Sequence, residues 1–309
     1  MTGAYRVRLG SKNQHADECF RDGFIGVGYG FTQDFTGELV DNWRKFNKKF
    51  IPVYMDLFPN KTKIAAGLAC GTFWTVCKGI CIHDLILSPD MDGNFRVGKI
   101  TGEYQHQPKN AIPQQRPLNW LGRIVRPDEM SESLFASCKA RGTVVNISKH
   151  ISELEQLLTG STHKPLDPKN NSLEGSSSFA MEKHLEEFLI KNWKQSGLGH
   201  DYDIYEQDGE LVGQQFPTDT GPMDILAISK DKQTLLVVEL KRGRAGDVVV
   251  GQILRYMGYV KEELAEDHQA VKGVIIAMDD TIGIQRALSV IHGKVDFYRY
   301  EVSFKLIKN

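Results

Sequence analysis

Two neighbouring apolar runs that each carry a carboxylate near one end constrain the fold of this chain most. The stretch from Gly221 to Arg244 reads "GPMDILAISKDKQTLLVVELKRGR". Its runs "MDILAIS" and "TLLVVEL" are typical of strands, and the polar "KDKQ" between them indicates a turn. A buried carboxylate without a partner is costly. Core strands that hold Asp224 and Glu239 therefore need a compensating group.

The register of this hairpin predicts which side chains meet. If the turn is centred between Asp231 and Lys232, Asp224 lies directly opposite Glu239. Side chains in directly opposed positions share a face, with Cβ atoms roughly 5 Å apart. Side chains alternate along a strand, so Lys241, two residues beyond Glu239, points to the same face. We expect one Asp, Glu and Lys cluster at the end of the sheet.

This cluster suits phosphodiester hydrolysis. Two carboxylates at such a distance repel unless a cation lies between them. Mg²⁺ is typically held by one or two carboxylates, with water and phosphate oxygens completing its shell. Lys241 can orient or help deprotonate an attacking water and neutralise developing negative charge. The alternative is a surface hairpin in which Lys241 merely pairs with a carboxylate, because a D…ExK pattern is short and also arises by chance.

The residues after the hairpin add specificity to this pattern. In "GQILRYMGYV", Gln252 and Tyr256 are four apart and share one face of a helix. They could hold a phosphate or the nucleophilic water, or alternatively serve helix packing. Arg242 and Arg244 in the preceding "KRGRAGD" suit bidentate contacts with phosphate.

Together these motifs resemble the PD-(D/E)xK nuclease superfamily, and most closely the catalytic domain of the NucS/EndoMS endonucleases, over roughly residues 179–308. The resemblance implies a restriction-endonuclease-like α/β domain in which Asp224 and Glu239 bind Mg²⁺ or Mn²⁺. It also implies that Lys241 is the catalytic lysine and that Gln252 and Tyr256 form the QxxxY motif of the family.

Two positions of the family pattern need comment. Family members often carry a glutamate on the preceding helix, and here Glu182, three residues before Leu185 on the apolar stripe, is the expected match, with Glu186 as its rival. The proline of the "PD" signature is not adjacent to the aspartate, because Met223 follows Pro222. This departure is common in the superfamily.

The chain divides into two predicted domains. The stretch 161–178, "STHKPLDPKNNSLEGSSS", is rich in Ser, Pro, Asn and Gly and cannot support a core, so we expect a linker there. Residues 179–309 then form the nuclease domain: a helix, the hairpin, a second helix over 248–263 and two further strands. This order predicts an α/β domain around a mixed sheet flanked by helices.

Residues 1–160 are expected to form a β-rich α+β domain. Short segments of β character are separated by Gly, Asp and Asn turns, and a short helix over 151–158 closes the domain. The two halves differ in charge: residues 1–164 hold 21 Lys and Arg against 16 Asp and Glu, while the remainder is acidic. Such a difference suggests different tasks for the two halves.

A second resemblance concerns the front half. The segments "GTFWTVCKGICIHDLILSP", "FRVGKITGEYQH" and "RPLNWLGRI" are similar to the EVE-like branch of the PUA superfamily, which implies a small β-barrel that binds nucleic acid. Several members accept an extruded modified base in an aromatic-lined pocket, and a flipped base needs stacking partners and polar groups. The candidates for such a base-reading pocket are Tyr29, Phe31, Trp74, Tyr104 and Trp120 for stacking, with Asp34 or Asp84 as polar readers. Each aromatic residue can alternatively be an ordinary core residue.

Two weaker signals are assigned structural roles. "GVGYGF" lacks the helix and distal acidic residue of a dinucleotide site, so its glycines are expected to serve turns or strand packing. Cys70, Cys77, Cys81 and His83 are conceivable zinc ligands, but their spacing is not that of paired CxxC motifs. We expect them in an apolar, strand-like segment in which small buried cysteines are common.

The expected protein is a two-domain, Mg²⁺- or Mn²⁺-dependent endodeoxyribonuclease whose N-terminal domain chooses the site. The domain pairing suggests a modification-dependent restriction enzyme acting on double-stranded, base-modified DNA, and cutting both strands would require a homodimer. The alternatives are a repair endonuclease acting on mismatched or branched DNA, and a reader of modified nucleic acid that does not cut. Short apolar runs and an odd number of cysteines favour a cytoplasmic protein with reduced thiols and no membrane partner.

Overall fold

The computed structural model describes residues 2–159, 184–207 and 209–301. The chain forms two compact units, Met1–Asp167 and Pro168–Asn309. The division lies within the stretch 161–178 that the sequence marks as a linker. That stretch and Glu182 are outside the described residues, so the predicted domain limits stay a prediction. No helix in the described part of the chain has the length and apolar character needed to cross a membrane.

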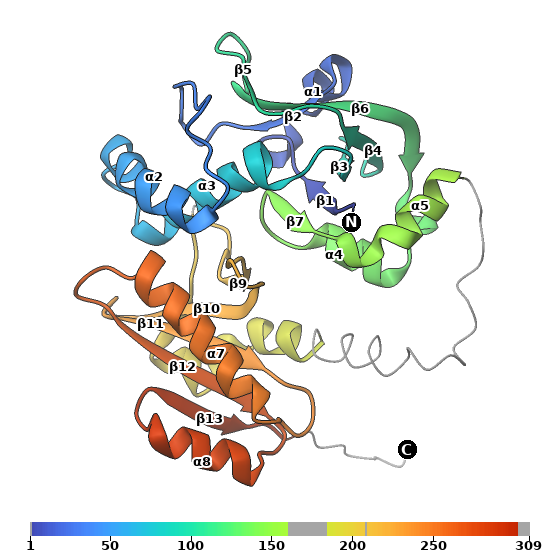
Figure 1. Ribbon diagram of the computed structural model, residues 1–309. Helices are drawn as coiled ribbons and strands as arrows, with labels where there is room; N and C mark the ends of the chain where they lie inside the picture. The colour runs from blue at the N-terminus through green and yellow to red at the C-terminus, as the bar shows by residue number, and fades with distance from the viewer. Residues whose placement is uncertain (1, 160–183, 208, 302–309) are drawn as a thin grey trace, which may run out of the picture. The chain divides into compact units, whose positions relative to one another are not determined.

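The first unit is organised around a seven-stranded sheet (Figure 1). Its order is β2-β6-β4-β3-β1-β7, with β5 beside β6. Among the described strands of this sheet, β1 and β3 pair in parallel and the other pairs are antiparallel. The strands are β1 Ala4–Val7, β2 Phe24–Val27, β3 Leu85–Pro89, β4 Phe95–Ile100, β5 Gln105–His106, β6 Gln114–Val125 and β7 Val144–Asn146.

Within residues 2–159, five α-helices accompany this sheet, more helix than the sequence suggests (Figure 1). The longest, α2, packs against α3, and both begin at side-chain caps, Asn42 and Thr62. The last turn of α3 runs into a π-helical segment over Thr75–Gly79. The helices are α1 Ala16–Asp22, α2 Trp43–Leu57, α3 Lys63–Trp74, α4 Glu132–Lys139 and α5 Ile151–Thr159.

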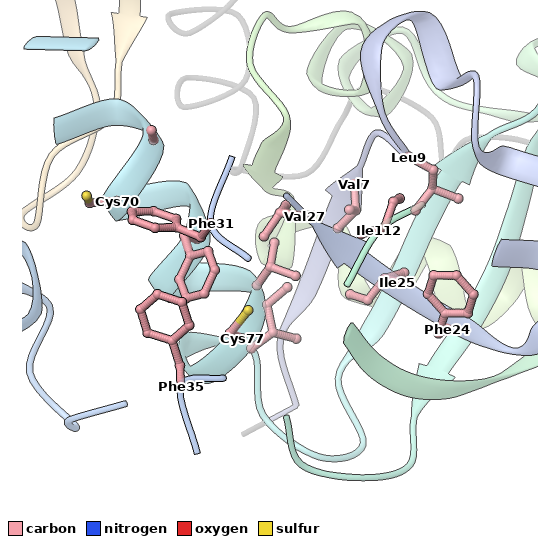
Figure 2. Packing of buried hydrophobic residues seen from close by; sticks show 14 of the residues in the cluster. Val7, Leu9, Phe24, Ile25, Val27, Phe31, Phe35, Cys70, Cys77 and Ile112 are labelled. Atoms are coloured by element: carbon pink, nitrogen blue, oxygen red, sulfur yellow. The ribbon is translucent and has the colours of Figure 1, made fainter. Parts of the chain in front are cut away.

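The segment around Cys70 corrects one expectation. It is not a strand: Cys70 lies in α3 and Cys77 in the π-helical segment, and both are buried in the aromatic core near Phe31 and Phe35 (Figure 2). Helix α3 is buried on nearly every side, so its sequence lacks the polar face that marks a helix. Burial raises the pKa of the Cys70 thiol to about 12 and raises that of Cys77 as well.

A PUA/EVE-like barrel is not confirmed for the first unit. Among its described strands, the end strands β2 and β7 are not paired with each other, and the helices α2 and α3 enclose a large share of the core. What the fold shows is a mixed α/β unit with a curled sheet.

The second unit contains the mixed sheet that the sequence predicts. Its order is β13-β12-β11-β10-β8, with β9 beside β10. Helices α7 and α8 connect the parallel strands β11, β12 and β13, while β10 and β11 form the antiparallel hairpin (Figure 1). The elements are a helix over 184–191, β8 Tyr202–Ile204, β9 Gln214–Phe216, β10 Met223–Ser229, β11 Thr234–Leu240, α7 Val248–Tyr259, β12 Ala270–Ala277, α8 Ile282–Val290 and β13 Val295–Arg299.

Candidate active site

The candidate site lies at the end of the β10–β11 hairpin. Ile225 pairs with Val238 and Ile228 with Leu235, which is the register expected for a turn between Asp231 and Lys232. The same register places Asp224 across from Glu239. Strand β11 is buried along almost its whole length, because helix α7 and the neighbouring strands β10 and β12 enclose it.

Glu239 and Lys241 form the centre of the site. The Glu239 side chain is 1% exposed, and the Lys241 ammonium donates to its Oε1 at 2.7 Å. The Lys241 side chain keeps 27% of its surface exposed. A buried glutamate thus meets a lysine that solvent can still reach, which suits a group that must act on an incoming substrate.

Asp224 lies beside this pair and is held by two hydrogen bonds. Its Oδ2 accepts from the backbone N–H of Leu240 at 2.7 Å, and its Oδ1 accepts from the Gln215 amide at 3.1 Å. Gln215 is on the short strand β9, whose register with β10 places it opposite Asp224. These contacts fix the orientation of the carboxylate.

Glu186 is connected to the site through the same glutamine. The Glu186 carboxylate is buried and accepts hydrogen bonds from the amides of Gln215 and Gln214, the latter at 2.6 Å. The sequence names Glu186 only as the rival of Glu182, and it does not single out Gln214 or Gln215. The opposed positions of Gln215 and Asp224 depend on β9, a three-residue strand with no periodic signal.

Helix α7 brings Gln252 and Tyr256 to the site. The Tyr256 hydroxyl donates to the Pro222 carbonyl at 2.9 Å and accepts from the Gln252 amide at 3.4 Å. Burial raises the pKa of Tyr256, and the nearby charges of Glu239 and Asp224 raise it further, while Lys241 opposes them. The hydroxyl therefore lies within electrostatic reach of all three residues of the cluster.

The two arginines that follow the hairpin differ in their surroundings. Both Arg242 and Arg244 are exposed. The Arg244 guanidinium donates to the Asp280 carbonyl at 2.8 Å and lies 4.0 Å from the Asp279 carboxylate. The Arg244 side chain thus contacts the loop that follows β12. Phosphate binding by either arginine stays a prediction.

The donor set fits a divalent cation. Gln215 joins the carboxylates of Asp224 and Glu186, and Lys241 pairs with Glu239 and offsets its charge. Among the described residues no three His, Cys, Asp or Glu side chains form a ready-made metal site. Two carboxylates are sufficient for Mg²⁺, which keeps several waters.

The residues predicted for a base-reading pocket have separate partners in the first unit. Phe31 is buried against Phe35 (Figure 2) and also contacts Tyr54 and Phe73. Asp84 accepts hydrogen bonds from the backbone N–H groups of Gly3 and Cys81. These two are committed to the core and to the backbone, so neither is open to a base.

The other five candidates are spread over different contacts. The Trp74 indole donates to the Val40 carbonyl, the Trp120 indole donates to the Cys19 carbonyl, and the Tyr29 hydroxyl contacts Thr143. Only Tyr104 and Asp34 come together, with 3.4 Å between the hydroxyl and the carboxylate.

Tyr104 also lines an open pocket of about 270 Å³ with Thr36, Leu39, Lys78 and Glu103. The base-reading role of this set stays a prediction.

Comparisons with known proteins distinguish the two units. Residues 181–293 match the model of the endonuclease NucS C-terminal domain, and residues 5–148 match a domain of unknown function (DUF8426). Endonuclease NucS of Methanocaldococcus jannaschii is 34% identical over 209 residues, which cover 66% of this chain and 65% of that protein. The NucS of Streptomyces griseus is 31% identical, with 53% of this chain and 65% of that protein covered.

Two solved structures are also similar. The first is an EndoMS–dsDNA2 complex, with 16% sequence identity and a TM-score of 0.31, covering 72% of this chain and 66% of that chain. The second is a repair endonuclease from Pyrococcus abyssi, with 18% sequence identity and a TM-score of 0.30, covering 71% of this chain and 78% of that chain.

The match to NucS proteins is informative mainly about the second unit. The chain spans less than two thirds of their length, 65% for each of the two NucS proteins above, while the NucS C-terminal model covers the hairpin, β9 and α7 that build the site. The second unit is therefore a NucS-like C-terminal domain, which confirms the resemblance predicted from the nuclease motif.

Proposed function

We propose that this chain is a metal-dependent endonuclease that hydrolyses DNA phosphodiester bonds at the edge of its C-terminal sheet. The observation that carries the proposal is the contact between Lys241 and the buried Glu239, with Asp224 across the hairpin. A reactive lysine beside paired carboxylates is the arrangement that metal-assisted hydrolysis needs. The NucS relatives, which are named as endonucleases, support the same reaction.

Each residue of the site has a proposed task. Asp224 and Glu239 would hold Mg²⁺ or Mn²⁺, which supplies Lewis-acid stabilisation of the scissile phosphate and lowers the pKa of a bound water. Lys241 orients the attacking water and offsets negative charge that develops on the phosphate. Gln252 and Tyr256 position the water or a phosphate oxygen, and Glu186 acts through Gln215 to hold Asp224 in place.

The substrate is proposed to be mismatched or branched double-stranded DNA. The resemblance of the second unit to the NucS endonucleases supports this repair function better than a restriction function. The modification-dependent restriction enzyme expected from the sequence is not supported by the comparisons, because the first unit matches a domain of unknown function. A homodimer would place two sites on one duplex and allow both strands to be cut.

The test compares cleavage of otherwise identical duplexes that are fully paired, mismatched, flapped or modified at cytosine, with Mg²⁺ or Mn²⁺. Asp224→Asn is paired with Asp203→Asn, since Asp203 is an exposed aspartate on β8 of the same sheet. We expect metal-dependent cleavage of mismatched or flapped DNA that Asp224→Asn abolishes and Asp203→Asn retains. Cleavage confined to modified duplexes would restore the restriction function, and binding without any cleavage would favour a non-catalytic reader.

A further inference from the structure

Helix α7 carries few polar groups on its outward face. The helix lies across β11 and β12 (Figure 1), and Gly273 of β12 leaves room for its inward side chains Ile253 and Met257. A surface helix ordinarily turns charged and polar residues to the solvent. The exposed positions of α7 instead hold apolar or small residues and one cation, namely Val248, Gly251, Leu254 and Arg255. Arg255 is the single charged residue of this helix.

Arg255 has no partner that would account for its charge. Its side chain is exposed, and within residues 2–159, 184–207 and 209–301 its guanidinium forms neither a hydrogen bond nor an ion pair. Asp247, the residue before the helix, lies against the start of α8, with its Cβ 3.5 Å from the place of a Cβ on Gly283. Arg244, by contrast, donates to the Asp280 carbonyl. Exposed arginines are common on protein surfaces, so the position of Arg255 decides what it can bind.

Arg255 lies beside the two residues that α7 brings to the candidate site. It follows Gln252 by three residues and directly precedes Tyr256. Residues three apart are neighbours on the surface of a helix, with Cβ atoms roughly 5–6 Å apart. Gln252 donates to the Tyr256 hydroxyl at 3.4 Å, which holds its amide at the site, and Arg255 occupies the solvent side of the same turn. A DNA strand with a phosphate at Gln252 would therefore pass Arg255.

Gly251 leaves room for a close contact on the same face. A glycine inside a helix lowers stability relative to alanine, so it usually has a packing reason. Gly273 has one, since a Cβ there would lie 2.7 Å from the Met257 sulfur. Around a Cβ on Gly251, the nearest heavy atom outside the helix backbone is Nη1 of Arg255 at 3.7 Å, which is an ordinary contact. Packing therefore does not require a glycine at position 251, whereas the close approach of a ligand would.

We infer that Gly251 and Arg255 of α7 hold the sugar-phosphate backbone of duplex DNA beside the scissile phosphate. Arg255 binds a phosphate through its guanidinium, whose planar shape suits bidentate contact, and Gly251 lets the backbone approach the helix. This inference rests on the proposed nuclease function, and it assigns to the same site two residues that align its substrate. Phosphate contacts position a protein on DNA without reading its sequence. The pair therefore provides affinity and alignment, and the choice of substrate is left to other residues.

The test measures binding of a fluorescently labelled mismatched duplex to the full chain over a series of salt concentrations, without divalent metal. Arg255→Gln should lower the affinity about tenfold and reduce the slope of log K against log salt by about 0.9, the value for one phosphate contact. Arg255→Lys should retain the slope and lose part of the affinity, because an ammonium does not bind a phosphate in bidentate fashion. Arg286→Gln, at an exposed arginine of α8, should change neither.

Gly251→Ala separates a ligand contact from a structural role. Alanine favours a helix more than glycine does, so the thermal midpoint should rise, while the added methyl group should weaken DNA binding severalfold. Gly258→Ala is the control on the same helix, at a position where a Cβ would meet no atom within 4 Å. It should raise the midpoint and leave DNA binding unchanged.

Two results would overturn the α7 contact: unchanged affinity and salt slope in a folded Arg255→Gln variant, or DNA binding by Gly251→Ala equal to that of the parent chain. In either case, metal-dependent cleavage by the parent would leave the nuclease proposal standing. Variants that alter the sedimentation of the chain but not its affinity for DNA would assign this face to a second copy and overturn the contact as well. A parent chain that neither binds nor cuts DNA would overturn both proposals.

Discussion

Gln215 donates a hydrogen bond to Asp224 from the directly opposed position of the neighbouring strand, with 3.1 Å between the amide nitrogen and Oδ1. The same amide donates to Glu186, so one side chain joins two carboxylates that are 38 residues apart in the chain. Gln215 thereby couples Glu186 to the proposed metal ligand Asp224. Glu186 therefore acts on the metal site through its negative charge and through its hydrogen bond with Gln215.

Glu186→Gln should weaken metal binding. The substitution keeps the shape of the side chain but removes one of three negative charges near the site, and it replaces an acceptor oxygen of the Gln215 hydrogen bond with a donor. We expect the metal concentration for half-maximal cleavage to rise about tenfold, equivalent to about 1.4 kcal/mol. The rate at saturating metal should change less.

The neighbouring glutamates provide the controls for this prediction. Glu187→Gln removes one negative charge from the residue next to Glu186. Glu182→Gln tests the position that the sequence favours for the family glutamate. A metal requirement that shifts with Glu182→Gln and not with Glu186→Gln would contradict the assignment of Glu186. Metal titrations of cleavage under single-turnover conditions give the comparison.

The sequence predicts the part of the site that depends on regular spacing. Asp224, Glu239 and Lys241 follow from strand alternation and a single turn, and Gln252 and Tyr256 follow from helical spacing. Gln215 could not be found in this way, because its place opposite Asp224 is fixed by β9, and its backbone is in the left-handed region with φ 49°. A short strand with such a residue has no periodic pattern to read.

The helix expected over 151–158 is present as α5, but the sequence did not locate α2 and α3, for a related reason. Helix α3 has buried residues on almost all sides, from Ile64 to Phe73, so apolar and polar positions do not alternate with helical period. Helix α2 contains Pro52 and begins with basic residues, both of which argue against a helix in a sequence. Its packing against the aromatic core outweighs these local costs.

Tyr256→Phe should lower both stability and activity. The hydroxyl bonds to the Pro222 carbonyl and the Gln252 amide in a buried place, so its loss should reduce the free energy of unfolding by about 1 kcal/mol. Because burial raises the pKa of Tyr256, the hydroxyl remains protonated at neutral pH and cannot be the general base. The rate should fall without a shift in the pH dependence of cleavage. Tyr259→Phe on the same helix is the control, and an equal fall in rate there would contradict a positioning role for Tyr256.

The stability of the first unit should depend on pH through His150. Burial lowers the pKa of His150, the adjacent Lys149 lowers it further, and Glu153 opposes them. Because the folded pKa lies below the unfolded value, the unfolded chain binds more protons, and stability rises with pH up to the usual histidine pKa of about 6.5. This contribution to stability is lost as the pH falls from the unfolded pKa of the histidine to its lower pKa in the folded protein. His150→Gln should weaken the dependence of the thermal midpoint on pH in this window. His268→Gln, at an exposed histidine, should leave that dependence unchanged.

Lys241→Met should abolish cleavage while strengthening metal binding. Lys241 donates to Glu239 at 2.7 Å, and its charge competes with any cation that approaches the same carboxylate. Since unit charges a few ångströms apart interact by several kcal/mol at an effective dielectric of about 20, removing the ammonium should raise the affinity for Mn²⁺ about tenfold or more.

Without metal, the Lys241→Met variant should unfold at a lower temperature than the parent, because the buried Glu239 has lost its cation. Added Mn²⁺ should then raise its thermal midpoint by more than that of the parent. Lys230→Met, at an exposed lysine beside the hairpin turn, should change neither property. Calorimetric titration with Mn²⁺ decides the matter: weaker metal binding by Lys241→Met would mean that the lysine supports the metal site and does not compete with it.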